Sequence, residues 1–134
     1  MDHEQAQANM QLVLDWIDAL RRGDIDAFAE RFHPDVAWVD VAGGLACDGR
    51  EQVLAWLRAA PVQSAQVEAL ELLADARHAV LSVRNHARQE LAGVQLDGQL
   101  FTVFTLRDGQ IVHLRDHAHR DDALSDAGLD YEWR

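Results

Sequence analysis

Apolar residues in the first third of the chain recur at the spacing of a helix face. Between residues 5 and 22 the recurring positions are Met10, Val13, Leu14, Ile17 and Leu20. Gly23 follows this stripe and can end a helix there. Asp24 can cap a second helix that places Ile25 and Phe28 on one face and stops before Pro34. The pattern therefore predicts a helical hairpin.

The next segment changes from helical periodicity to a short strand pattern. Residues 36–41 read Val-Ala-Trp-Val-Asp-Val, and two glycines then interrupt the chain. Asp48, with Glu51 three positions later, is typical of a capping box at the start of a helix. Pro61 would end that helix. The apolar positions of this predicted third helix are Val53, Leu54, Trp56 and Leu57.

The remainder of the chain has the pattern of a strand meander. The predicted strands are residues 66–73, 78–90, 99–106 and 110–118. Asp108-Gly109 is a strong hairpin turn, and Asp97-Gly98 is a second turn signal. The first predicted strand is the weakest, because its residues favour a helix by intrinsic propensity.

One predicted strand is apolar on both of its faces. In residues 101–106, Phe101 and Val103 alternate with other large apolar positions, although one face of a single curved sheet should meet water. Something must cover the outer face. We therefore expect a homodimer through the sheet that buries Phe101 and Val103.

Composition narrows the class of protein and of partner. The 134 residues, 49% hydrophobic and 26% charged, predict one globular domain spanning residues 1–134. A net charge of −11 repels phosphate backbones and anionic lipid, so neither nucleic acid nor a membrane is expected as a partner. Cys47 is the only cysteine, so no intramolecular disulfide or thiolate zinc site can form. With no leader-like or membrane-spanning stretch, we expect a cytoplasmic protein.

Several stretches resemble a known group of small-molecule enzymes. Residues 23–28 (Gly-Asp-Ile-Asp-Ala-Phe), 35–40 (Asp-Val-Ala-Trp-Val-Asp) and 49–53 (Gly-Arg-Glu-Gln-Val) resemble the ketosteroid isomerases in letters and spacing. Leu114-Arg115-Asp116 resembles the last strand of limonene epoxide hydrolases. The resemblance implies the α+β, cone-shaped NTF2-like (SnoaL-like) fold, with three N-terminal helices packed on a curved, mostly antiparallel sheet. This fold hosts isomerases, hydrolases, cyclases and non-catalytic binders.

The resemblance to the isomerases assigns a general base to Asp40. A carboxylate that removes a carbon-bound proton needs partial desolvation, which an apolar neighbour such as Trp38 could supply. The alternative is an aspartate that binds loop amides near the two glycines. Trp16 and Thr102 stand where the isomerases carry a tyrosine and a protonated aspartate, so steroid isomerisation itself is not expected. The interpretation favoured for Trp16 is a core residue on a helix face, and that for Thr102 is a plain strand former.

The resemblance to the epoxide hydrolases instead uses the later strands. Arg84 and Asp116 match two members of a group that shares a water molecule, and His86 replaces a carboxylate. Alternation places Arg84 and His86 on one strand face, and we expect them on the concave face with Asp116 and Asp40. His86 beside Asp116 would be an imidazole oriented by an acid. The alternative is an Arg84–Asp116 ion pair that only stabilises the sheet.

Three histidines near the end of the chain raise the question of a metal. His113, His117 and His119 share strand parity, but Asp116 holds the inward face, so these rings should point outward. We therefore predict no metal site.

The sequence as a whole favours an isomerase, cyclase or hydrolase that performs acid–base chemistry on a small, partly apolar molecule without metal or organic cofactor. The predicted catalytic group is Asp40, His86, Asp116 and Arg84. The alternatives are a non-catalytic ligand carrier and an assembly module whose cone is filled by its own side chains. The predicted pocket wall is Trp16, Trp38, Leu100, Thr102, Phe104 and Leu114.

Overall fold

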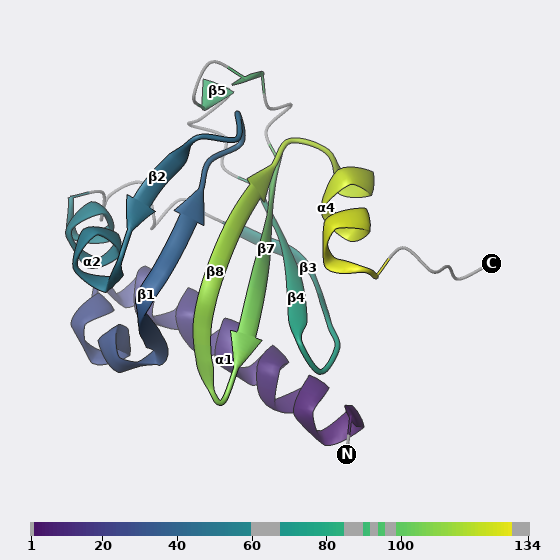
Figure 1. Ribbon diagram of the computed structural model, residues 1–134, viewed down its shortest axis with the longest axis horizontal. Helices are drawn as coiled ribbons and strands as arrows, with labels where there is room; N and C mark the ends of the chain where they lie inside the picture. The colour runs from purple at the N-terminus through teal and green to yellow at the C-terminus, as the bar shows by residue number, and fades with distance from the viewer. Residues whose placement is uncertain (1, 60–67, 85–89, 92–93, 96–98, 130–134) are drawn as a thin grey trace.

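A computed structural model describes residues 2–59, 68–84, 90–91, 94–95 and 99–129 (Figure 1). The helices are α1 (Asp2–Arg22), the 3-10 helix η1 (Ile25–Arg31), α2 (Arg50–Arg58) and α4 (Arg120–Ala127). The strands are β1 (Phe32–Val39), β2 (Leu45–Asp48), β3 (Glu68–Ala74), β4 (His78–Arg84), β5 (Glu90–Leu91), β6 (Val94–Gln95), β7 (Gln99–Arg107) and β8 (Gln110–His117).

Six strands form one curved sheet in the order β2-β1-β8-β7-β4-β3. All neighbours are antiparallel except β1 and β8, which run parallel. β5 and β6 pair separately. In Figure 1, α1 runs behind the large sheet and α4 (yellow) lies at its right. We call the face that packs with α4 the outer face and the face toward α1 the inner face. Helices on a curved sheet confirm the expected α+β class.

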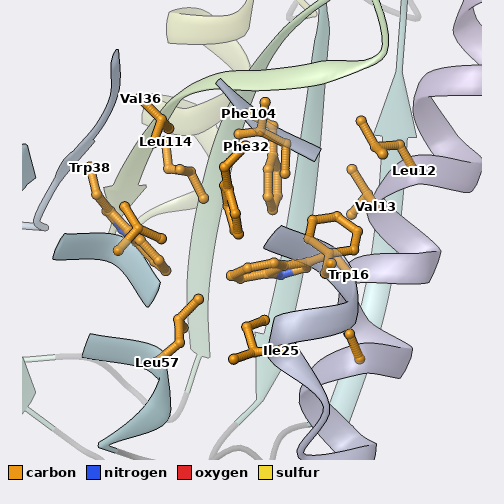
Figure 2. Packing of buried hydrophobic residues seen from close by; sticks show 14 of the residues in the cluster. Leu12, Val13, Trp16, Ile25, Phe32, Val36, Trp38, Leu57, Phe104 and Leu114 are labelled. Carbon is orange, nitrogen blue, oxygen red and sulfur yellow. The ribbon is translucent and has the colours of Figure 1, made fainter. Parts of the chain in front are cut away.

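The main core fills the space between the inner face and the N-terminal helices. Trp16 of α1 lies at its centre, with ring centroids 5.5 Å from Phe32 and 6.1 Å from Phe104 (Figure 2). The sheet contributes alternate residues to this core, among them Leu81, Phe104 and Leu114. Because alternate residues of a strand share a face, these positions fix which side chains of β4, β7 and β8 point inward.

Helix α1 is amphipathic and is also held by polar contacts. Asn9, which is buried, donates from Nδ2 to the carbonyl of Asp75 in the β3–β4 turn at 2.9 Å and accepts from Gln5 at 3.0 Å. The bond to Asp75 fixes the helix against the β3–β4 edge of the sheet, and the bond from Gln5 holds the Asn9 side chain in place. Within the described ranges, no helix is both long and apolar enough to cross a membrane.

The segment after α1 differs in detail from the sequence prediction. The second helix is a short 3-10 turn, and Pro34 lies inside β1, where pairing with β8 is irregular between Phe32 and Ala37. A proline has no N–H for a ladder, so it is tolerated at such a break. The chain then returns as β2, a strand that the sequence did not predict. The N-cap of the third helix, α2, is Gly49 (φ 96°) and not Asp48, whose N–H donates to Gln52 Oε1 at 2.8 Å.

The meander follows the prediction more closely. The weakest predicted strand is β3, paired with β4 from Glu68 to Ala74. The turn between β7 and β8 has positive φ at both Asp108 (54°) and Gly109 (78°), as a type I′ hairpin requires. The second predicted turn, Asp97-Gly98, lies outside the described residues.

The outer face is covered by the chain itself. Phe101 and Val103 are 7% and 0% exposed, and they pack with Ala123, Leu124 and Ala127 of α4. Phe101 and Val103 therefore need no second subunit to cover them, and the homodimer itself stays a prediction. A helix with only three buried residues carries too weak an apolar pattern to be recognised as a cover from the sequence.

Candidate functional site

The inner face carries one buried carboxyl group. Asp116 is the penultimate residue of β8, pairs with Thr102 of β7, and is 6% exposed. The hydroxyl of Thr102 donates to its Oδ1 at 2.9 Å. The indole Nε1–H of Trp38 on β1 donates to its Oδ2 at 3.0 Å. Three neighbouring strands thus supply a carboxyl group and one neutral donor for each of its oxygens.

The surroundings make this carboxyl group a weak acid. Burial raises the pKa of Asp116 to about 6, from an ordinary value of 3.8. The hydrogen bonds from Thr102 and Trp38 act against burial and lower the pKa, as does the nearby charge of His117, whereas the negative charge of Asp40 raises it. Desolvation is the larger influence, because neutral donors replace only part of the lost hydration. A carboxyl group with this pKa exchanges its proton close to neutral pH.

Asp40 lies just beyond β1 and organises the turn into β2. Its Oδ1 accepts from the backbone N–H groups of Ala42 (2.9 Å) and Gly44 (3.0 Å). Its own N–H donates to the carbonyl of Gly44 at 2.8 Å. These are the loop-amide bonds that the sequence offered as the alternative to catalysis. A side chain at Gly44 would place its Cβ 3.3 Å from Asp40 Oδ2, so the close approach suits glycine. Asp40 is also near enough to raise the pKa of Asp116.

Arg84 does not join this group, contrary to the prediction. It pairs with Gln99, three residues from the Leu81–Thr102 pair that shares a face with Asp116. An odd offset along a regular strand reverses the face, so Arg84 lies on the outer side. There its Nη1 is 4.0 Å from Glu68 Oε1. The expectation that Arg84 contacts Asp116 is wrong. His86, the fourth predicted catalytic residue, lies outside the described residues.

The predicted wall residues fall into two groups. Trp16, Trp38, Phe104 and Leu114 are buried in the core cluster, and Thr102 is buried beside Asp116. Leu100, one inward position further along β7, is partly exposed, and so is its partner Val83 on β4. Exposure on the inner face of β7 therefore begins one step beyond the Thr102–Asp116 row.

Two aromatic side chains extend this site beyond Asp116. Trp38 is flanked by Trp16, at a centroid distance of 5.9 Å, and by Trp56 of α2, at 5.0 Å. The sequence assigned Trp38 to the wall and missed its role as a hydrogen-bond donor, since nothing in the letters links residues 38 and 116. Cys47 is the cross-strand partner of Trp38. Burial and the charge of Asp116 raise the pKa of its thiol, which does not favour a thiolate nucleophile.

His113 and His117 of β8 lie on the outer side of the sheet, as their strand parity predicted, and His119 is the N-cap of α4. His117 Nε2 is 2.8 Å from Asp126 Oδ2, an oxygen that also accepts from Arg115 Nε at 2.6 Å. His113 Nδ1 is 3.0 Å from Arg115 Nη1. Burial, followed by the charge of Arg115, lowers the pKa of His113. Across the described part of the chain, no three His, Cys, Asp or Glu side chains are grouped to hold a metal ion.

Known proteins similar to this chain share its architecture. The family model described as SnoaL-like domain matches residues 13–114. A candidate ketosteroid isomerase from Kribbella flavida has 20% identity and a TM-score of 0.67, with 86% of this chain and 80% of that chain covered. A candidate SnoaL-like polyketide cyclase from a Jannaschia species has 19% identity and a TM-score of 0.65, with 95% of each chain covered. An LEH-like epoxide hydrolase of M. tuberculosis has 17% identity and a TM-score of 0.64, covering 90% of this chain and 89% of that chain. No curated protein matches the sequence. At these identities the structural likenesses show the fold alone.

Proposed function

Because the chain belongs to the family of SnoaL-like domains and has their NTF2-like fold, we propose that it is an acid–base enzyme of the isomerase or cyclase kind. Its substrate would be a small, partly apolar organic molecule with an acidic C–H group, and no metal or organic cofactor would take part. The observation that carries this proposal is a buried carboxyl group, Asp116, with one neutral donor on each oxygen and a pKa of about 6.

The proposed proton transfer uses Asp116 and not Asp40. At neutral pH a carboxyl group with a pKa near 6 is mostly ionised, so it can accept a proton from a carbon next to a carbonyl. The protonated form is then acidic enough to return that proton to another atom of the same substrate. Each carboxylate oxygen has two lone pairs, so the bonds from Trp38 and Thr102 leave room for a substrate proton. No net proton or electron is gained or lost.

The approach to Asp116 is proposed to run along the inner face. Leu100 and Val83 are partly exposed one step from the Thr102–Asp116 row, which gives the approach an apolar side. Asp40, also partly exposed, gives it a polar side. Such a path suits a molecule with an apolar ring and a polar end.

Epoxide hydrolysis is less well supported than proton transfer. That reaction, as the sequence resemblance described it, needs Arg84 beside Asp116, and Arg84 lies on the outer face near Glu68. The homodimer expected through Phe101 and Val103 is not part of the proposal, because α4 covers both residues.

The test is hydrogen exchange at carbon, which needs no knowledge of the physiological product. A ketone with an apolar ring, 2-tetralone, is incubated with the protein in deuterated buffer near pH 7, and loss of its α-proton signals is followed by NMR. We expect exchange faster than in buffer alone. Asp116→Asn should lower the enzymatic rate by at least about 100-fold, the usual size of a general-base contribution.

Two further variants separate the possible assignments. Arg84→Ala removes a charge on the outer face, where the Arg84 side chain is 40% exposed, and should change the rate by less than about twofold. Asp40→Asn would abolish exchange if Asp40 were the base. Under the proposal it keeps measurable exchange, with a lower apparent pKa, because the negative charge of Asp40 raises the pKa of Asp116. If ring ketones bind but none exchanges across a panel of such compounds, the chain is a ligand carrier.

A further inference from the structure

Trp56 is an exposed tryptophan at the edge of the candidate site. It belongs to α2, whose apolar residues Val53, Leu54 and Leu57 are buried, yet 45% of Trp56 is exposed. Its only aromatic partner in the described part of the chain is Trp38, at a centroid distance of 5.0 Å and an interplanar angle of 66°.

The ring that Trp56 packs against, Trp38, is also the hydrogen-bond donor to Asp116. Trp38 meets Trp16 on one side and Trp56 on the other, and its Nε1–H reaches Asp116 Oδ2 at 3.0 Å. The hydrogen bond depends on the rotation of the indole about χ2, which is a broad torsion. Trp56, packed edge-to-face, and Trp16, packed at a tilt, restrict that rotation, since aromatic ring pairs favour particular angles. Trp16 is buried deep in the core, so Trp56 is the outer of the two restraints.

We propose that Trp56 is a positioning residue for Asp116: by packing against Trp38 it keeps the indole N–H of Trp38 directed at the carboxyl group. The inference rests on the proposed function only for its effect on turnover, because the hydrogen bond itself is observable without a substrate. It gives Trp56 a role that its exposure alone would not suggest. A surface residue of α2 would then influence a carboxyl group on β8, through one intervening ring.

The test follows the indole N–H signals in the full-length protein by ¹H–¹⁵N NMR over a pH series. Loss of a peak in Trp38→Phe identifies Trp38. In the unmodified protein its signal should shift with pH, with a midpoint near 6, because its acceptor titrates there. In Trp56→Ala we expect that shift to shrink by at least about half and the N–H to exchange faster with water, as for a weakened bond. Trp56→Phe keeps an aromatic ring and should restore most of the response.

Leu14→Ala is the matched control, because Leu14 of α1 is also 45% exposed and is not part of the site. It should leave the Trp38 signal unchanged. The titration midpoint of Trp56→Ala distinguishes a lost hydrogen bond from a loosened structure, because the two move the pKa of Asp116 in opposite directions. Loss of the donor raises the pKa of Asp116, whereas simple loosening that admits water lowers it.

A Trp38 signal that titrates identically in Trp56→Ala and the unmodified protein would overturn the inference, as would a lower midpoint. Reduced thermal stability with an unchanged Trp38 signal would also overturn it, since that is the result of a purely structural contact. These outcomes differ from failure of the proposed function, in which the Trp38 signal responds as expected but Asp116→Asn leaves ketone exchange unaltered.

Discussion

Asp116→Asn should make the protein more stable above neutral pH while removing its proposed activity. Asparagine has nearly the same shape, and both of its polar atoms can be satisfied in place. Its Oδ1 can accept from Trp38 Nε1, and its Nδ2 can donate to the hydroxyl of Thr102, which also accepts. The variant therefore removes the buried charge while each polar atom of the asparagine side chain keeps one hydrogen bond.

The magnitude follows from the pKa of Asp116. A value of about 6 in the folded protein lies about 2 pH units above the ordinary 3.8, which corresponds to about 3 kcal/mol. Because the folded pKa is raised, the folded state binds a proton more tightly than the unfolded chain. Stability from this residue is therefore fully present below about pH 4 and is lost as the pH rises through 6. Asparagine does not titrate, so its advantage over aspartate should grow from near zero at pH 4 to about 3 kcal/mol at pH 8.

Urea unfolding of both proteins at several pH values between 4 and 8 measures this difference directly. The net charge of −11 changes the stability of both proteins with pH, but it changes them nearly equally, so the difference isolates residue 116. A difference that stays constant with pH would refute the reasoning. So would an asparagine variant that is less stable than the original protein at pH 8.

Three other outcomes follow from the contacts of Asp116 and of α4. Thr102→Val removes a donor that lowers the pKa of Asp116, so the NMR titration midpoint of that carboxyl group should rise by about one pH unit above its original value. The rate of ketone exchange should fall as the pH drops below about 6, because proton abstraction needs the ionised carboxylate; a flat profile from pH 5 to 8 would exclude Asp116 as the base. Leu124→Ala, in the buried contact between α4 and the outer face, should lower the free energy of unfolding by about 2–4 kcal/mol in urea titrations, whereas a change below about 0.5 kcal/mol would mean that α4 is not docked.

The order of the elements was easier to predict from the sequence than the face of the sheet on which each strand residue lies. The order of helices and strands could be inferred from periodicity, because α1 and the β7–β8 hairpin have strong local signals. The face of the sheet on which Arg84 lies could not be inferred in this way. In β4 the inward residues Leu81 and Val83 alternate with Val80, which packs with α4, and with Ser82, which is buried as well. A strand buried on both faces has no polar alternation to show which parity points inward.

Local patterns in the sequence indicated some residues of the candidate site but not the contacts between distant residues. Asp116 could be found because its neighbours resemble the last strand of a known family. The bond from Trp38 to Asp116 joins positions 78 residues apart, and no local pattern encodes such a pair. The loop role of Asp40 was foreseeable, since a carboxylate before two glycines is typical of a turn that binds its own amides.

The most direct test of the central claim is the titration of the Asp116 carboxyl carbon by ¹³C NMR, with the Asp116→Asn spectrum used to assign its signal. The account predicts a midpoint of about 6, well above the ordinary aspartate value of 3.8. A midpoint near the ordinary value of 3.8 would contradict it, because Asp116 would then be too weak a base to carry the proposed proton transfer.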